Sequence, residues 1–219
     1  MRVIFLIDGF NLYGSIIELQ KDYGLHVKWL DIKSLLRSYL SSYGNDSQAS
    51  EIHYFTALQH YATTMDQHDP NHFDPDKVNR HNDYIKCLED TGIKVHYGRF
   101  KKKYIFCQNC QRRFVKYEEK ETDVAIGVTL LDIAMSDRAD LLILVTGDTD
   151  IAPAVRICLN RFPDLPIGFC FPYKRKREEL AALATARCIT MKARTYSHHL
   201  FPNPFILQNG ILVNKPVTW

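Results

Sequence analysis

Val3-Ile4-Phe5-Leu6-Ile7-Asp8-Gly9-Phe10-Asn11 defines the architecture of this chain, because an unbroken apolar run that ends at a carboxylate and a glycine predicts a buried strand with chemistry at its tip. A second run, Leu141-Leu142-Ile143-Leu144-Val145, ends at Thr146-Gly147-Asp148-Thr149-Asp150. Strands that are apolar along their whole length are buried on both faces, as in a parallel sheet. We therefore expect the two acidic tips to meet at one edge of such a sheet.

Strand-like and helix-like segments alternate along most of the chain. Strands are expected at 3–7, 51–58, 93–97, 141–145 and 167–171, and helices at 12–19, 31–43, 76–91, 122–135, 151–159 and 178–186. Such alternation implies right-handed crossovers and a mostly parallel sheet with helices on both faces, which is an α/β fold.

Three segments depart from this alternation. Residues 59–75 carry His, Asp, Asn and two prolines and are expected to form a loop. Residues 98–119 are basic and predict an inserted hairpin, and residues 201–219 predict an extended C-terminal tail. The 219 residues are enough for one sizeable core, so we expect a single domain over 1–219.

Polar side chains at the expected strand ends and helix starts are candidates for a catalytic metal site: Asp8, Asn11, Asp123, Asp148 and Asp150. Each Asp alone is more simply a cap or turn former, so the prediction depends on their joint pattern. Carboxylates gathered at one place repel one another unless a cation lies between them. Oxygen ligands without a nearby His pair favour Mg²⁺ or Mn²⁺ over Zn²⁺.

The expected roles differ among these residues. Asp8 and Asp148 follow the strand tips directly and are the expected direct metal ligands. Asp123 and Asp150 would bind the metal through water or position an attacking water. Asn11, Thr146 and Thr149 are suited to hydrogen-bond a phosphate or a metal-bound water. Thr122 and Thr149 are the expected N-caps of the helices that begin beside Asp123 and Ile151.

The motifs Asp8-Gly9-Phe10-Asn11, Glu118-Glu119-Lys120-Glu121-Thr122-Asp123 and Thr146-Gly147-Asp148-Thr149-Asp150-Ile151-Ala152-Pro153-Ala154-Val155 resemble the NYN domain, a family of the PIN-like nuclease superfamily. The resemblance runs over nearly the whole chain. It implies a PIN-like three-layer fold and metal-dependent ribonuclease activity. Carried over residue by residue, it implies that Asp8, Asp123, Asp148 and Asp150 bind the metal, with Asn11 beside them.

The net charge of +3 says little about a partner, but the basic residues are clustered. Lys174-Arg175-Lys176-Arg177 follows an expected strand, on the same sheet edge as the acids, and is the better candidate for holding a nucleic-acid backbone. The basic hairpin also carries aromatic residues, which are typical both of single-strand binding and of ordinary hairpin packing.

The six cysteines do not resemble a disulfide framework in a chain of this size. Cys107 and Cys110 have the spacing of a zinc knuckle, yet a structural zinc needs further ligands, from a distant side chain or a second subunit. The sequence leaves open whether the chain forms a homodimer and whether the hairpin tip is free of metal. No secretory signal or membrane span is visible, so a cytoplasmic location is expected.

These features together predict an Mg²⁺- or Mn²⁺-dependent ribonuclease that hydrolyses phosphodiester bonds of RNA, with single-stranded RNA as the expected substrate. The alternative is a non-catalytic RNA-binding or regulatory module that retains the acidic metal pocket. An aspartyl-nucleophile phosphohydrolase is disfavoured, because the first strand ends in Asp8-Gly9-Phe10-Asn11 rather than an Asp-x-Asp pair.

Overall fold

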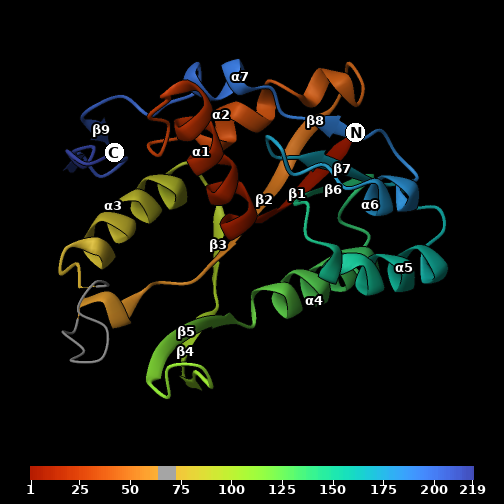
Figure 1. Ribbon diagram of the computed structural model, residues 1–219. Helices are drawn as coiled ribbons and strands as arrows, with labels where there is room; N and C mark the ends of the chain where they lie inside the picture. The colour runs from red at the N-terminus through yellow and green to blue at the C-terminus, as the bar shows by residue number, and fades with distance from the viewer. Residues whose placement is uncertain (64–72) are drawn as a thin grey trace.

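The computed structural model describes residues 1–63 and 73–219, so part of the loop expected over 59–75 lies outside the described residues. A six-stranded sheet forms the centre, in the order β3-β2-β1-β6-β7-β8, and every neighbouring pair is parallel (Figure 1). Its strands are β1 (Arg2–Asp8), β2 (Gln48–Thr56), β3 (Lys94–Tyr97), β6 (Leu141–Val145), β7 (Ile167–Phe171) and β8 (Ile189–Thr190). The predicted α/β, PIN-like fold with a parallel central sheet is confirmed.

Helices cover both faces of the sheet. They are α1 (Gly9–Tyr23), α2 (Ile32–Arg37), α3 (Lys77–Asp90), α4 (Thr122–Met135), α5 (Ala152–Arg161), α6 (Glu178–Leu183) and α7 (Ala193–Ser197), with 3₁₀ turns η1 (Leu40–Ser42), η2 (His60–Thr63) and η4 (Thr149–Ile151). In Figure 1, α1 and α2 lie on the opposite side of the sheet from α4 and α5. The result is three layers.

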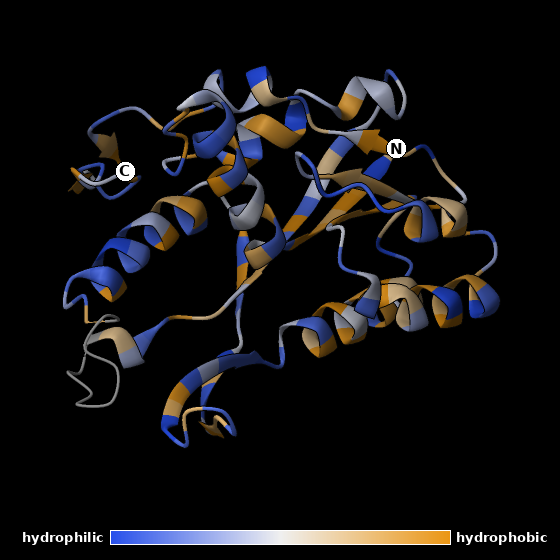
Figure 2. Ribbon diagram, in the orientation of Figure 1, coloured by the Kyte–Doolittle hydropathy of each residue, from blue (hydrophilic) through white to orange (hydrophobic). Residues whose placement is uncertain are grey.

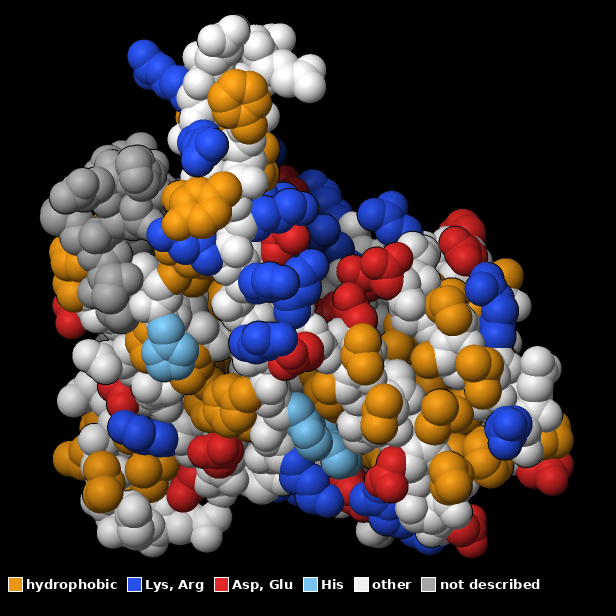
Figure 3. All heavy atoms as spheres, turned by 90° about the horizontal axis from the view of Figure 1, so that it is seen from below, with side chains coloured by type: hydrophobic (Ala, Val, Ile, Leu, Met, Phe, Trp, Pro, Cys, Tyr) orange, Lys and Arg blue, Asp and Glu red, His pale blue; other side chains and the backbone are white. Residues whose placement is uncertain are grey.

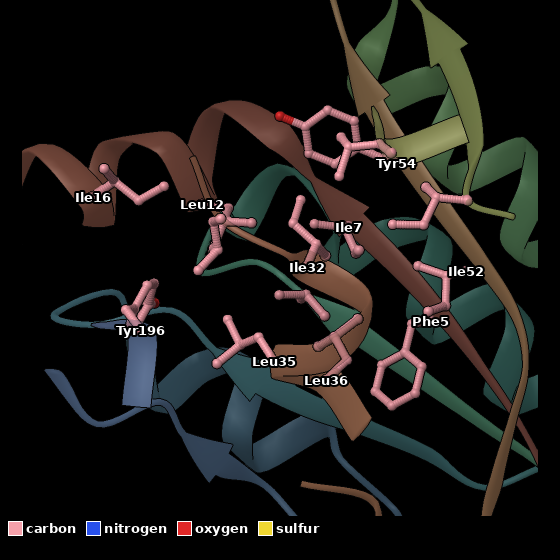
Figure 4. Packing of buried hydrophobic residues seen from close by; sticks show 14 of the residues in the cluster. Phe5, Ile7, Leu12, Ile16, Ile32, Leu35, Leu36, Ile52, Tyr54 and Tyr196 are labelled. Carbon is pink, nitrogen blue, oxygen red and sulfur yellow. The ribbon is translucent and has the colours of Figure 1, made fainter. Parts of the chain in front are cut away.

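Alternation along β1 divides the core between the two faces, because successive side chains of a strand point to opposite sides. Phe5 and Ile7 pack with α1, α2 and α3, whereas Ile4 and Leu6 pack with α4, α5 and α6. Figure 4 shows the first of these clusters, with side chains of β1 and β2 gathered against those of α1 and α2. Figure 2 shows hydrophobic residues concentrated on the central strands.

The strand order of the sheet changes direction between β1 and β6, which lie side by side at its centre. From β1 the chain passes through α1 to β2 on one side, and from β6 it passes through α5 to β7 on the other. In open α/β sheets the crevice beyond the carboxyl ends of two such strands is the usual ligand site. Asp8 ends β1 and Asp148 lies just after β6, so both acids lie at this crevice.

The basic insertion is a two-stranded antiparallel hairpin of β4 (Arg99–Phe106) and β5 (Arg113–Lys120). It projects from the body, and Lys and Arg side chains are visible along it in Figure 3. Part of this charge is neutralised, because Lys103 and Lys120 form salt bridges with Glu118.

Some elements differ from the sequence expectations. The helix expected over 31–43 divides into α2 and η1, since α2 ends at Arg37. The tail at 201–219 is not simply extended: it contains a small ladder of β9 (Phe205–Ile206) and β10 (Leu212–Val213), and Phe201 and Val213 are buried in the core. Among the described residues, none of the helices combines the length and apolar character that crossing a bilayer requires.

Candidate metal centre

Three carboxylates from remote parts of the chain converge at the crevice. Asp8, Asp123 and Asp148 each offer one oxygen, and these oxygens all lie within 4.8 Å of one another. They come from the end of β1, the first turn of α4 and the residue that precedes η4. The surrounding acidic pocket has a volume of about 200 Å³ and is lined by Asp8, Phe10, Asn11, Glu119, Thr122, Asp123, Asp148 and Arg175.

Asp8 is the most enclosed of the three acids, with 4% of its surface exposed. It caps α1, because its Oδ1 accepts a hydrogen bond from the Asn11 N–H at 2.9 Å. Its Oδ2 accepts from the Thr146 hydroxyl at 2.9 Å. Burial raises the pKa of Asp8 above its usual range, the two hydrogen bonds oppose this, and the charge of Asp148 adds to it. The environment therefore disfavours an isolated anion at this position.

The two predicted hydrogen-bonding residues Thr146 and Asn11 connect the strand tips rather than pointing free into the pocket. The Thr146 hydroxyl donates to Asp8 and accepts from the Asp148 N–H at 2.9 Å, so one hydroxyl links the two acids. Asn11 Oδ1 accepts from the Gly147 N–H at 2.9 Å and joins α1 to the end of β6. Both residues hold the geometry of the acids.

Asp148, and not Thr149, caps the helical segment that follows β6. Its Oδ1 accepts from the Asp150 N–H at 3.1 Å, so the expectation that Thr149 caps this segment is wrong. Asp150 is exposed and does not belong to the converging group of three, although its charge contributes to the raised pKa of Asp123. Thr149 is half-buried and is not among the residues that line the acidic pocket.

Asp123 lies in the first turn of α4, as expected, but Thr122 is the first residue of the helix rather than its cap. Glu119 performs the capping: its Oε1 accepts from the Thr122 N–H at 3.0 Å and also from the Thr122 hydroxyl. Glu121 between them adopts a left-handed φ of 83°. Sequence reasoning missed Glu119 as a residue of the pocket, and its spacing of three residues before Thr122 was the available signal.

Burial and the neighbouring carboxylates together raise the pKa of Asp123. Its pKa is raised to about 6, first by burial and then by the charges of Asp8, Asp148, Glu119 and Asp150. The salt bridges of the described residues include none to Asp8, Asp123 or Asp148, and Arg175, the basic residue that lines the same pocket, does not pair with them. Three carboxylate oxygens in a pocket without an imidazole or thiol fit a hard divalent ion such as Mg²⁺ or Mn²⁺.

Arg175 is the one member of the predicted basic segment 174–177 that lines the acidic pocket. A Cβ at Gly147 would lie 1.8 Å from the Arg175 carbonyl oxygen, so this loop reaches the strand tip only because position 147 is glycine. The guanidinium packs beside Gly14 of α1. Its Nε is enclosed without a hydrogen-bond partner among the described residues, which leaves a cation beside the acids with unused donor capacity.

The other members of the segment are engaged elsewhere. Lys174 forms a salt bridge with Asp22 of α1 at 2.5 Å, and Lys176 forms one with Glu178 at 2.9 Å. Arg177 is exposed at the start of α6. None of these three side chains lines the acidic pocket.

Cys107 and Cys110 lie at the tip of the hairpin as free thiols. Hydrogen bonds from the backbone and side chain of Cys110 lower the pKa of Cys107. Within the described residues, no third Cys, His or carboxylate completes a group with them that could hold a metal. Zinc at this tip stays a prediction that needs ligands from outside this group.

One known protein is similar to this chain in sequence. A 6-hydroxy-3-succinoylpyridine 3-monooxygenase, HspA of Pseudomonas putida, is 26% identical over 199 residues, which cover 78% of this chain and 60% of that protein. The chain thus spans less than two thirds of the length of that curated relative.

Among solved structures, a protein of unknown function from Vibrio parahaemolyticus has a TM-score of 0.54 at 15% identity, with 87% of this chain and 93% of the other covered. At this identity the likeness shows a shared fold and nothing more. A deacetylase in complex with teicoplanin has a TM-score of 0.34, and this likeness carries no argument. Residues 2–161 match the NYN domain, so this chain belongs to the NYN domain family.

Proposed function

We propose that this protein is an Mg²⁺- or Mn²⁺-dependent ribonuclease that hydrolyses phosphodiester bonds of single-stranded RNA. The observation that carries the proposal is the convergence of Asp8, Asp123 and Asp148 within 4.8 Å at the sheet crevice. NYN membership supports a nuclease-like activity. When bound, a divalent ion at such a site lowers the pKa of a coordinated water and offsets charge on a phosphoryl group.

In this proposal the three carboxylates hold the ion, and Asn11 and Thr146 keep Asp8 and Asp148 in place through their hydrogen bonds. Asp150 lies close enough to affect the pKa of Asp123 and is suited to orient a water at the open side of the site. Arg175 contributes a cation for a phosphate oxygen. Lys and Arg of the hairpin are further candidates for contacts with the RNA backbone.

Incubating labelled single-stranded RNA with the purified protein tests this proposal. We expect cleavage with Mn²⁺ or Mg²⁺, none with EDTA, and none by an Asp148→Asn variant. Asp164→Asn is the matched control, because Asp164 is exposed and lies outside the acidic pocket. RNA that is retarded but never cleaved would support the alternative, a non-catalytic RNA-binding or regulatory module.

A second candidate function comes from the curated relative, whose name describes a monooxygenase acting on 6-hydroxy-3-succinoylpyridine. With 26% identity and 60% of that protein covered, action on a small hydroxylated pyridine is a distinct proposal. Oxygen uptake that requires such a pyridine and a reduced nicotinamide or flavin as electron donor would favour it over the nuclease. An absence of uptake together with metal-dependent RNA cleavage would reject it.

A further inference from the structure

A second cavity lies beside the metal centre, between α1 and α3 at the carboxyl end of β2. We call it the ring pocket and define it by Gly9, Phe10, Tyr54, Gln59, Tyr84 and Trp219, with Lys28, Lys77 and His81 also in its wall. Its volume is about 110 Å³ and most of its wall is apolar. Cavities of this kind, with a few convergent polar groups, are the usual form of small-ligand sites.

The two sites are neighbours. Asp8 of β1 pairs in register with Phe55 of β2, and the residues next to them, Gly9 and Tyr54, both line the ring pocket. Phe10 lines both the ring pocket and the acidic pocket. A Cβ at Gly9 would lie 2.8 Å from the Tyr54 ring, so the glycine after Asp8 lets that ring pack against the start of α1.

Aromatic rings form much of the wall. Trp219 lies edge-to-face against Tyr84, with ring centroids 5.6 Å apart, and against His81 at 5.7 Å. Burial, with the nearby charges of Lys77, Arg80 and Lys28, lowers the pKa of His81 to about 4, so its imidazole is neutral at physiological pH. Such a wall suits an uncharged planar ring, which gains from both apolar burial and aromatic contact.

Gln59, which lines the pocket, has a polar atom that no described residue satisfies. Gln59 Oε1 is enclosed and has no hydrogen bond within the described residues. Leaving a buried acceptor unsatisfied is costly, so rotation of the Gln59 amide toward a ligand N–H or O–H in the cavity would be favourable. Lys28 and Lys77 are half-buried and form no salt bridge with a described residue, so they can receive an anionic substituent of the ring.

The size of the cavity restricts the ring. An enclosed apolar cavity of about 150 Å³ accommodates benzene. The ring pocket is smaller but partly open, so a single six-membered ring fits with its substituted edge outside. A purine would leave one of its two rings in solvent. We infer that the ring pocket binds a single six-membered heteroaromatic ring that carries an anionic group, such as a pyrimidine nucleotide or a pyridine carboxylate.

The assignment to a pyrimidine base rests on the proposed ribonuclease function, in which that base would be adjacent to the phosphate at the metal centre. The ring pocket itself does not rest on it. Binding is therefore measured in EDTA, where the metal centre cannot contribute. A protein without nuclease activity would still pass this test, and a failure of binding would leave the cleavage experiment unaffected.

The experiment is calorimetric or Trp-fluorescence titration of the full chain with uridine 5′-monophosphate, nicotinate, adenosine 5′-monophosphate and ribose 5-phosphate. We expect saturable binding of one or both single-ring compounds, and weaker binding of the purine and of ribose 5-phosphate. Uridine monophosphate alone would identify a nucleic-acid base as the source of the ring, and nicotinate alone a free aromatic acid. No binding of either, or equal binding of ribose 5-phosphate, would overturn the inference.

Variants tie binding to the pocket. Gln59→Leu is expected to weaken binding of the preferred single-ring compound about tenfold, because it removes the acceptor. Gln48→Leu, at the exposed opposite end of β2, is the matched control and should bind as the wild type does. Lys77→Met should reduce the preference for the monophosphate over the nucleoside uridine. Equal affinities of the Gln59 variant and the wild type, with unchanged melting temperatures, would contradict the assignment.

Discussion

The metal centre and the ring pocket occupy the same sheet edge but are built by opposite means. At the candidate metal centre, oxygens of three carboxylates lie within 4.8 Å of one another and form no salt bridge with a described Lys or Arg, and the pKa of Asp123 is raised to about 6. In the ring pocket, apolar walls and nearby cations lower the pKa of His81 to about 4. As proposed, the first site needs a cation to offset its negative charge, whereas the second offers an apolar aromatic wall to a ring. One sheet edge can thus place a charged and an apolar site side by side.

The largest expected effect distinguishes an acid of the candidate metal centre from an acid outside the acidic pocket. Asp148→Asn should lower kcat for RNA cleavage by at least about 100-fold, because metal stabilisation of the phosphoryl charge is worth several kcal/mol. Its fold should remain intact by circular dichroism. Cleavage by this variant at the wild-type rate would remove Asp148 from the site, and Asp164→Asn should cleave as the wild type does.

Metal binding should stabilise the protein through the acidic site alone. Mn²⁺ at about 100 times its Kd should add about 2.7 kcal/mol to the free energy of unfolding, seen as a higher melting temperature. Asp8→Asn should abolish this increase, while Gln59→Leu in the ring pocket should retain it. An equal increase in both variants would place the ion elsewhere.

Arg175 should matter more than its basic neighbours. Arg175→Met is expected to reduce kcat/KM for RNA about tenfold, because it removes a cation that lines the acidic pocket. Lys174→Met should change it by less than about twofold, because Lys174 already forms an exposed salt bridge with Asp22. Equal losses in the two variants would show that the segment acts as a diffuse charge.

The two sites should also respond to pH in opposite directions when metal is absent. The pKa of Asp123 rises from 3.8 to about 6 on folding, so its contribution to stability is lost as the pH rises through that window. The pKa of His81 falls from 6.5 to about 4, so its contribution is lost as the pH falls through that window.

Urea unfolding in EDTA between pH 4 and 7 measures these small effects. Asp123→Asn should gain stability relative to the wild type as the pH rises, and His81→Gln should gain it as the pH falls. Stability curves that stay parallel to that of the wild type would contradict both pKa shifts.

The strand tips were predictable because their signal is local. Each of β1 and β6 is apolar along its length and ends near a carboxylate, which is enough to place Asp8 and Asp148 at one sheet edge. The cap at η4 was not, since Asp148 and Thr149 are both good N-caps and the backbone after β6 decides between them.

Other features depend on contacts between distant segments. Arg175 reaches the acidic pocket because Gly147 lets its backbone approach, and nothing in residues 174–177 alone distinguishes it from Lys174. Gly9, Gln59, His81 and Trp219 of the ring pocket come from separate parts of the chain. No short sequence motif therefore predicts this pocket. Sequence patterns identify strand ends, but not which loops fold over them.

The most direct measurement is an anomalous difference map from crystals grown with Mn²⁺. We predict a Mn²⁺ peak coordinated by oxygens of Asp8, Asp123 and Asp148, which is absent from crystals of the Asp148→Asn variant. Crystals in which these three carboxylates turn apart, or in which Mn²⁺ binds elsewhere and leaves them empty, would contradict it.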